Sequence, residues 1–304
     1  MSDQANQPDQ HKNEVAAHFG NSSRHWDAVY GDRQDVGARR IQERQRRILA
    51  YVDRLDLPAA SRVLDLGCGA GRASVELLRR GFTLEGVDIS QDMINLARKN
   101  AEQAGFTSEF HFQVGDAEQL PFADGSFDLI VSIGMLGVGP VSWGRSVMAE
   151  LHRILKPGGY VALTYPNKLS VGHACSKLDV PVSLRRLARR LLGRAVANEK
   201  PDWVMDRTKY TPGQFNRMLD RIGFQAIDSM SLGFAPIQLL GRSVLTRQGS
   251  IRLDDTLHRL ADGKATRFLR RLGRTYLALA QKTPVSGGKD STAADAARPV
   301  SARS

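Results

Sequence analysis

A glycine-rich turn between a strand pattern and a helix pattern constrains this chain more than any other feature. The strand pattern at 62–66 leads into Gly67, and Gly69 and Gly71 follow at alternate positions before a helical pattern begins. Glycines let the backbone turn tightly and approach a ligand with no side chain between. The free N–H groups at the start of the next helix favour a ligand with an anionic group. The sequence therefore predicts an α/β domain with a ligand site at this turn.

Short apolar runs alternate with amphipathic stretches along most of the chain, which is typical of an α/β fold with a mostly parallel sheet. Strands are expected at 62–66, 84–88, 109–114, 127–132, 160–165, 224–230 and 276–280. Helices are expected at 36–57, after the glycine turn, from Ser90 towards Gly105, at 143–155, from Thr211 onward and near 257–269. We expect a doubly wound, mostly parallel seven-stranded sheet with helices on both faces.

Two interruptions of this alternation predict helical cap insertions in the C-terminal half, at about 166–208 and 232–272. The first contains a basic amphipathic stretch, 182–194. The segments 1–13 and 284–304 are polar or rich in small residues, and we expect them to be disordered tails. The Rossmann-like domain would then span 14–283.

The positive charge is concentrated in the C-terminal half. The chain has a net charge of +11, but residues 61–165 hold 9 Lys and Arg against 12 Asp and Glu, whereas residues 168–282 hold 22 against 9. Such a basic half can face nucleic acid, anionic lipid headgroups or an acidic small molecule. It can equally be a solvated surface with no partner, and composition alone leaves both interpretations open.

The two cysteines, Cys68 and Cys175, predict neither a disulfide framework nor a metal site. No Lys or His accompanies Cys68 in sequence, so we expect a passive thiol there. The chain has no apolar run of 18 residues, and its first residues lack the apolar core of a secretory signal. A cytoplasmic location is the expectation.

Three details of the turn specify its ligand. The glycines follow a G-x-G-x-G spacing rather than the G-x-G-x-x-G of dinucleotide-binding proteins. Asp65 stands two residues before the first glycine, where a carboxylate would repel a pyrophosphate but suit an ammonium group. Asp88 ends the second strand and could accept hydrogen bonds from two ribose hydroxyls. These features describe a ligand with a ribose, a positive amino group and a carboxylate but no phosphate, and they disfavour a nicotinamide-dependent oxidoreductase.

The run 63–71 resembles motif I of class I S-adenosylmethionine-dependent methyltransferases. Residues 87–90 resemble the second motif of that family, and 115–122 resemble its strand-three segment. Residues 127–132 and 151–159 are similar to the corresponding parts of its small-molecule branch, and the matches follow the order and spacing of the family. The resemblance implies a Rossmann-like methyltransferase with S-adenosylmethionine as its cofactor.

The resemblance also implies a set of cofactor-binding residues: Asp65, Gly67, Cys68, Gly69, Gly71, Asp88, Ile89, Met93, Asp116, Ala117, Ser132 and Ile133. The members before residue 72 would shape the methionine end of the pocket. Asp88 would bind the ribose, and Ile89 and Met93 would pack on the adenine. Asp116 and Ala117 would contact the adenine amino group, while the last two would border the transferred methyl. Without the resemblance, Met93 on a helix face would be read as core.

Aromatic residues N-terminal to the glycine turn support two interpretations. Phe19, Trp26 and Tyr30 could form a lid that excludes water from the sulfonium, as a similar aromatic segment does in small-molecule members of the family. They could also only hold an N-terminal helix on the sheet.

Methyl transfer is an in-line displacement, so the protein mainly has to hold the acceptor at roughly 3 to 3.5 Å from the methyl. A general base is needed only for an acceptor that must lose its proton early. His18, His25, His173 and Tyr165 are candidates, but none has a partner at a telling spacing. No catalytic residue is therefore assigned.

The residues after strand four argue against methylation of nucleic-acid bases. Amino-methylating enzymes carry an Asn/Asp-Pro-Pro-aromatic turn there, whereas this chain has Ser132-Ile133-Gly134-Met135. Neither cysteine is placed for cytosine C5 chemistry.

We therefore expect a small-molecule acceptor that is acidic, aromatic or lipid-like. The basic insertions, with Arg185, Arg186 and Arg189 in the first, would form a cap that can also contact an anionic membrane. An RNA methyltransferase that uses the basic half, and a non-catalytic protein that binds S-adenosylmethionine, stay open as alternatives. The sequence indicates no oligomeric state.

Overall fold

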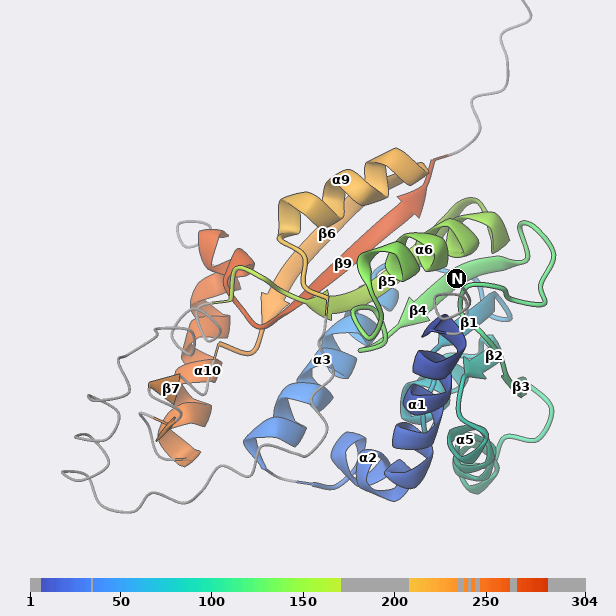
Figure 1. Cartoon of the computed structure of the whole chain (residues 1–304), viewed down its shortest axis with the longest axis horizontal. Coiled ribbons are helices and arrows are strands. Elements are labelled where there is room, and N and C mark those ends of the chain that lie inside the picture. The colour runs from blue at the N-terminus through green and yellow to red at the C-terminus, as the bar shows by residue number, and fades with distance from the viewer. Residues whose placement is uncertain are drawn as a thin grey trace, which may run out of the picture.

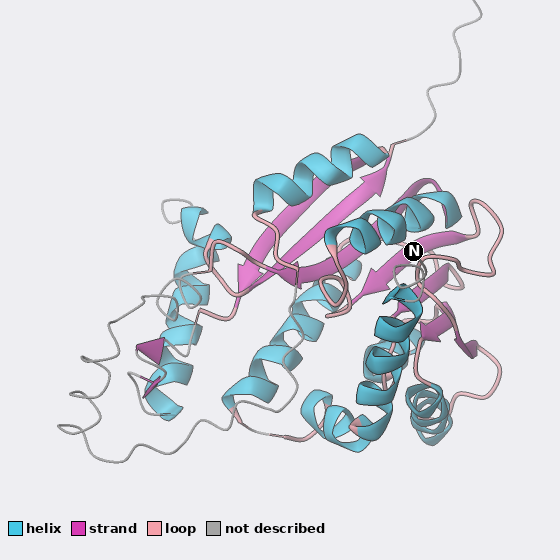
Figure 2. Cartoon of the chain, in the orientation of Figure 1, coloured by secondary structure: helices cyan, strands magenta, loops and turns pink. Residues whose placement is uncertain are grey.

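A seven-stranded sheet forms the centre of the protein, and helices cover both of its faces (Figures 1 and 2). The computed structural model describes residues 7–33, 35–170, 208–234, 238–239, 242–243, 247–262 and 267–283. The strands of the sheet are β1 (Arg62–Leu66), β2 (Thr83–Asp88), β3 (Phe110–Val114), β4 (Phe127–Ser132), β5 (Leu155–Pro166), β6 (Phe224–Leu232) and β9 (Thr275–Lys282). A separate short hairpin consists of β7 (Gln238–Leu239) and β8 (Arg242–Ser243).

The helices of the described part are α1 (Gln7–Asn21), α2 (Ser23–Tyr30), α3 (Val36–Val52), α4 (Arg72–Leu78), α5 (Gln91–Gln103), α6 (Val141–Ile154), α9 (Pro212–Ile222), α10 (Arg247–Asp262) and the 3₁₀ helix η1 (Arg267–Arg271). Buried side chains of α3, α4 and α5 pack on one face of the sheet, and those of α6 and α9 pack on the other. Figure 1 shows α1 and α2 beside α5, at the end of the molecule that holds β1, β2 and β3.

The strand order β3-β2-β1-β4-β5-β9-β6 confirms the expected doubly wound architecture. Strands β1 to β5 pair in parallel, and β9 pairs antiparallel with both β5 and β6. The sheet is therefore mostly parallel, as the sequence predicts, with the last strand of the chain inserted between β5 and β6.

Both faces of the sheet are buried, which explains the nearly continuous apolar runs of its strands. Neighbouring residues of β1 point to opposite sides, so Val63 belongs to the cluster under α3, α4 and α5, whereas Leu64 belongs to the cluster under α6 and α9. The same alternation divides Leu129 from Ile130 in β4.

Two helix predictions need correction. Residues 7–13, expected to be part of a disordered tail, form the first half of α1 because His11 and Lys12 contact the loops after β4 and β3. The helix expected near 257–269 spans Arg247–Asp262 instead.

Smaller differences concern element ends. Helix α3 stops at Val52 rather than at residue 57, since Asp56 adopts a positive φ of 48° and Pro58 follows. The turn expected at 156–159 lies inside β5, where the pairing with β4 shifts register between Phe127 and Leu129.

Some predicted segments lie outside the described residues. They are most of the first insertion, including the basic stretch 182–194 and His173, parts of the second insertion, and the tail 284–304. Within the described residues, no helix combines the length and apolar character that a bilayer crossing requires.

The topology places a ligand site at the carboxyl ends of the central strands. The chain continues from β1 to β2 and β3 on one side and returns to β4 and β5 on the other. In open α/β sheets, ligands bind at this point of reversal, outside the carboxyl ends of the strands.

Candidate functional site

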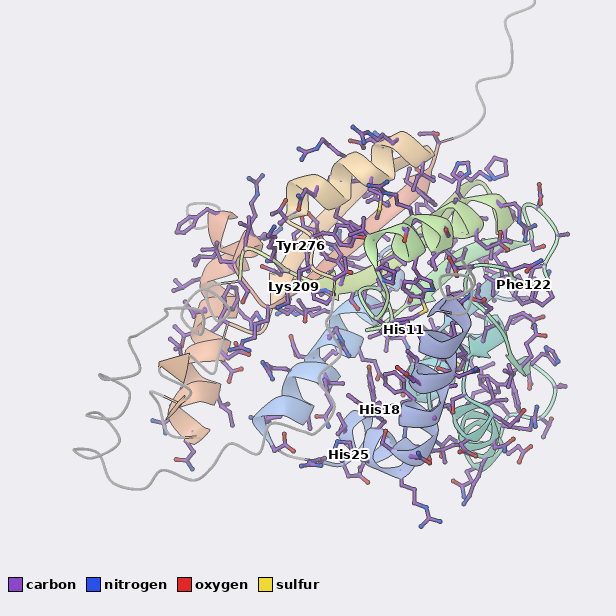
Figure 3. The ribbon with its side chains drawn as sticks, viewed as in Figure 1. His11, His18, His25, Phe122, Lys209 and Tyr276 are labelled. Carbon is purple, nitrogen blue, oxygen red and sulfur yellow. The ribbon has the colours of Figure 1, made fainter. Side chains whose placement is uncertain are left out.

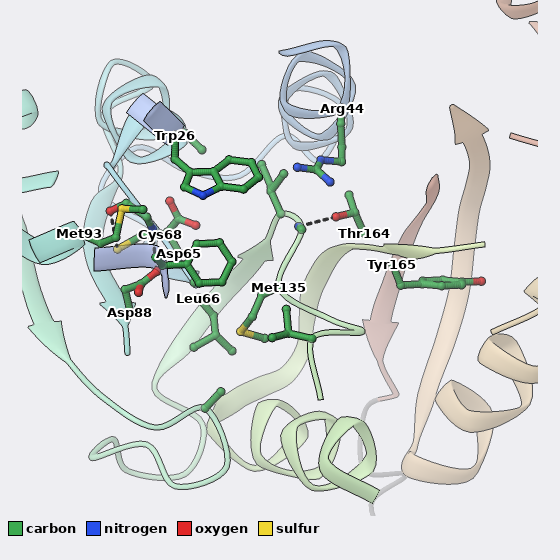
Figure 4. A pocket seen from close by; sticks show the side chains of 18 of the residues that line it. Trp26, Arg44, Asp65, Leu66, Cys68, Asp88, Met93, Met135, Thr164 and Tyr165 are labelled. Carbon is green, nitrogen blue, oxygen red and sulfur yellow. Dashed lines mark hydrogen bonds between the residues drawn. The ribbon is translucent and has the colours of Figure 1, made fainter. Parts of the chain in front are cut away.

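A cavity of about 410 Å³ lies at the carboxyl ends of β1, β2, β4 and β5, below the N-terminal helices (Figure 4). Its size is within the range of pockets that bind small molecules. Of the twelve predicted cofactor-binding residues, all but Gly71 and Ser132 line this cavity. The structure thus brings together residues from four separate parts of the sequence.

The glycine turn forms one wall of the cavity. Gly67 and Gly69 have positive φ values of 71° and 53°, which glycine adopts without strain. A Cβ atom on Gly67 would lie 2.9 Å from Cβ of Met135, so the loop after β4 packs directly on the turn. A Cβ on Gly69 would meet no atom within 4 Å, because that side of the backbone faces open space.

Gly71 has a structural role instead. It precedes α4 with a φ of 73°, and a Cβ there would lie 2.9 Å from the backbone of Ala97 in α5. Its missing side chain therefore lets α4 and α5 approach closely. Ser132 is buried at the end of β4 but does not reach the cavity, whereas the next residue, Ile133, lines it.

Two carboxylates lie at this end of the cavity, Asp65 buried and Asp88 half-buried. Asp65, which is 1% exposed, accepts a hydrogen bond of 2.6 Å from Oγ of Ser74. Asp88 accepts hydrogen bonds of 3.0 Å from the backbone N–H groups of Gly69 and Ser90. Burial raises the pKa of Asp65 to about 6 and also raises the pKa of Asp88. Such carboxylates favour a ligand that brings a positive charge or hydrogen-bond donors.

The predicted adenine contacts continue the same wall. Ile89 and Met93 line the cavity at the start of α5, and Met93 is also part of the buried interior. Cys68 is buried beside them, and burial raises the pKa of its thiol. The raised pKa disfavours the thiolate, which is the reactive form of cysteine.

Asp116 and Ala117 line the cavity after β3. The Asp116 carboxylate is already engaged, since it accepts hydrogen bonds of 2.6 Å from Nζ of Lys12 and 3.0 Å from the backbone N–H of Glu118. Lys12 also lies 2.8 Å from Glu118, and both partners raise the pKa of Lys12. The first helix of the chain is thereby fixed to the residue predicted to contact the adenine.

The aromatic residues of the N-terminal helices cover the cavity. Phe19, Trp26 and Tyr30 all line it, and the rings of Phe19 and Trp26 are 5.7 Å apart. Figure 4 shows Trp26 extending across the opening beside Asp65 and Cys68. This placement favours the lid interpretation over a purely structural one.

An ion pair fixes this lid beside the glycine turn. Asp27 of α2 accepts hydrogen bonds of 2.6 and 3.1 Å from Arg72, the first residue of α4. Asn100 donates to Asp27 and to the backbone carbonyl of Ala70. The position of α2 is therefore coupled to the loop that would surround the cofactor.

The candidate bases are poorly placed. Tyr165 lies in the wall, but its ring stacks on Phe215 at 4.0 Å and burial raises its pKa, which disfavours the phenolate. His18 and His25 do not line the cavity. The lining histidine is His11, which sequence analysis missed and which contacts the backbone carbonyl of Val138 at 3.3 Å. Figure 3 shows it at the opposite end of α1 from His18.

Comparison with known proteins identifies the family. Residues 63–159 match the family described as Methyltransferase domain. The ubiquinone/menaquinone biosynthesis C-methyltransferase UbiE of Dinoroseobacter shibae is 31% identical over 192 residues, which cover 61% of this chain and 74% of UbiE. The chain belongs to the class I S-adenosylmethionine-dependent methyltransferases.

Other members of this family match over shorter stretches. Methyltransferase GfsG of Streptomyces halstedii is 38% identical over 112 residues, which cover 36% of this chain and 40% of GfsG. The chain thus matches less than half the length of that relative.

The fold is also that of solved methyltransferases. Magnesium protoporphyrin IX methyltransferase (ChlM) from Synechocystis PCC 6803, solved with bound S-adenosylhomocysteine (SAH), superimposes with a TM-score of 0.57. The superposition covers 90% of this chain and all of ChlM at 17% sequence identity.

The other end of this methyltransferase's cavity was not predicted from the sequence. It is cationic, with Arg40, Arg44, Lys209 and Arg274 in its lining. Arg40 and Arg44 are four residues apart in α3, so both lie on the helix face that also presents Ile41 and Gln45 to the cavity. That i, i+4 spacing in a predicted helix could have indicated two cations on one helix face. Arg274 precedes β9 and has no motif around it.

Proposed function

We propose that this protein transfers a methyl group from S-adenosylmethionine to a small-molecule acceptor. The observation that carries the proposal is the division of one cavity into two ends. Three carboxylates of the family motifs, Asp65, Asp88 and Asp116, lie at one end of the cavity. The other end is lined by arginines and has room for a second ligand. Such a cavity suits two ligands that meet in the middle.

The residues of the acidic end fit the cofactor. Asp65 is buried, and no cation of the described residues pairs with it, so it can accept hydrogen bonds from the amino group of the methionine part. Each oxygen of Asp88 has lone pairs left for ribose hydroxyls. The open space beside Gly69 lets the backbone approach the ligand closely. When bound, S-adenosylmethionine supplies a methyl group already activated on a sulfonium.

The remaining cofactor contacts are proposed on their position in the same wall. Ile89 and Met93 would pack on the adenine, and Asp116 and Ala117 would contact its amino group. Ile133 would border the methyl, and Trp26 and its neighbours in the lid would exclude water. Gly71 and Ser132, which do not line the cavity, would act through the packing around it.

The chain's contribution to the chemistry is positioning. Holding the acceptor in line with the methyl lowers the barrier by removing translational and rotational freedom beforehand. No described residue is placed as an evident general base, so an acceptor atom that is already nucleophilic suits the site best. We propose an acidic, aromatic or lipid-like acceptor, reached through the predicted cap insertions of a 14–283 domain.

Calorimetric titration tests the cofactor. We expect S-adenosylmethionine and SAH to bind wild-type protein with micromolar affinity and NAD to give no heat. Asp88→Ala should lose this binding, while Asp220→Ala, a matched change on the exposed side of α9, should keep it. Binding of NAD, or unchanged SAH binding by Asp88→Ala, would refute the proposed site.

Two alternatives remain distinguishable. An RNA methyltransferase would use the basic half, so it would bind RNA with strong salt dependence. A non-catalytic protein would bind S-adenosylmethionine without turnover of any acceptor.

A lipid-vesicle pelleting assay at low and high salt tests peripheral contact with an anionic membrane, and absence of pelleting at low salt would exclude such contact.

A further inference from the structure

We propose that Arg40, Arg44 and Arg274 form a subsite for an oxyanion, a carboxylate in the first instance, carried by the methyl acceptor. This inference rests on the proposed function and names the chemical class of its acceptor. It comes from the cationic end of the cavity, which no motif of the family explains.

The three arginines all line the cavity. Arg40 and Arg44 project from successive turns of α3, and Arg274 leads into β9. A Cβ on Gly233 would lie 3.2 Å from Cδ of Arg40 and 3.8 Å from Cβ of Arg274, so these two arginines flank the same glycine.

Arg44 connects this subsite with the cofactor end. A Cβ on Gly134 would lie 2.8 Å from a guanidinium nitrogen of Arg44, and the N–H of Gly134 donates to Oγ1 of Thr164 at 2.7 Å. The next residue, Met135, packs on Gly67. Figure 4 shows Arg44 reaching towards Thr164, across the cavity from Asp88. An anion on Arg44 would therefore place the rest of its molecule towards the glycine turn.

The arginines hold more positive charge than their surroundings balance. Burial, and then the charge of Arg274, lower the pKa of Arg40 to about 10, and Arg44 acts in the same direction. The carboxylate of Asp254 raises the pKa of both Arg40 and Arg274, and the carboxylate of Asp35 raises the pKa of Arg40. Two carboxylates thus act on these three cations, and Asp35 also pairs with Arg33, which leaves a site for a further negative charge.

Hydrogen-bond donors are also unused there. The buried Nε atoms of Arg40 and Arg44 have no acceptor among the described residues, although Arg44 donates from Nη2 to the Tyr30 hydroxyl at 2.7 Å. Buried donors are normally satisfied, and a planar guanidinium pairs best with a carboxylate or a similar oxyanion. A neutral acceptor would leave these donors and charges uncompensated.

The opposite charges at the two ends of the cavity also set the orientation of the acceptor. The carboxylates at 65 and 88 would repel an anion from the cofactor end, while the arginines attract it to the other. The reactive atom of the acceptor would then face the methyl, because the anionic group is held away from it.

The test uses full-length protein saturated with SAH and three probe pairs: benzoate, 1-naphthoate and decanoate, each against its primary amide. We expect at least one carboxylate to bind about 10-fold tighter than its amide, or more, because each buried charged hydrogen bond favours the anion. Arg40→Gln and Arg44→Gln should each remove most of this preference. Arg46→Gln, an exposed position on the same helix that lies outside the cavity, should keep it.

Each outcome decides the proposal. If no carboxylate binds better than its amide, or if Arg46→Gln loses the preference as strongly as the cavity variants, the oxyanion subsite is wrong. SAH binding is measured on every variant, and we expect it to stay within a few-fold of wild type. Failure of wild-type protein to bind SAH would refute the proposed function instead, so the two failures are distinguishable.

Discussion

Nζ of Lys12 lies 2.6 Å from the Asp116 carboxylate and thereby joins the first helix of the chain to the loop after β3. The two residues are 104 positions apart in sequence. If Asp116 contacts the adenine as we propose, the placement of α1 and the binding of the cofactor would depend on the same carboxylate.

Lys12→Gln should loosen α1 and weaken SAH binding by roughly 3- to 10-fold, since the pair is partly exposed and contributes only about 1 kcal/mol. Hydrogen exchange should rise in residues 7–21 without bound SAH. Lys99→Gln, on the exposed side of α5, serves as the control. Unchanged exchange in α1 would show that Lys12 does not hold the helix in place.

Asp65→Asn should stabilise the ligand-free protein at pH 8 and abolish SAH binding. Burial raises the folded-state pKa of Asp65 from 3.8 to about 6, so the folded protein holds the extra proton between these values and stability falls as pH rises through them. The gain of the variant should reach about 1–3 kcal/mol above pH 6 and disappear near pH 4.

Urea unfolding of both proteins at pH 4 and pH 8 measures this difference, with Asp220→Asn as the control for a surface carboxylate. A stabilisation that is equal at the two pH values would contradict the assigned titration. SAH affinity of wild-type protein should also fall below pH 6, as Asp65 becomes protonated.

Alanine substitutions at two glycines of the turn should affect different properties, stability at Gly71 and cofactor binding at Gly69. Gly71→Ala should destabilise the protein by roughly 2–5 kcal/mol, because its Cβ would meet the Ala97 backbone at a strained φ. Gly69→Ala should lose only about 1–2 kcal/mol, since its Cβ meets nothing, yet it should lose SAH binding. Thermal unfolding and calorimetry of the two variants check this, and equal losses of stability would be the contrary result.

Arg40→Met should raise the free energy of unfolding by about 1–2 kcal/mol, because it removes a desolvated cation that faces Arg274 and Arg44 while keeping an apolar stem beside Gly233. Arg46→Met on the exposed side of α3 should change it by less than about 0.5 kcal/mol. Urea unfolding compares them. A destabilised Arg40→Met protein would show that Arg40 is well compensated in the folded state.

The strands and the cofactor end of the cavity were predictable because their signals are local. The glycine spacing, Asp65 and Asp88 lie within one strand–turn–helix–strand unit, where the chain direction determines their positions. Gly71 and Ser132 do not line the cavity, and the packing of Gly71 against Ala97 cannot be read from the turn itself.

The cationic end of the cavity could not be predicted in the same way. Arg274 and Arg40 meet only through the insertion of β9 into the sheet, and His11 reaches Val138 across 127 residues of sequence. Residues 7–13 are polar, and we expected them to be disordered. The partners of His11 and Lys12 lie in the loops after β4 and β3, far along the chain, so the sequence gives no sign of these contacts. Such long-range contacts leave no periodicity in the sequence.

The position of β9 has a consequence for the order in which the protein can mature during synthesis. β6 pairs with β9, and β9 alone joins it to β5. The last described strand therefore holds β6 in the sheet. Arg274 and Thr275, at its start, also form part of the cavity wall. A nascent chain can complete the glycine turn early, but it cannot complete the cationic end of the cavity until β9 has left the ribosome.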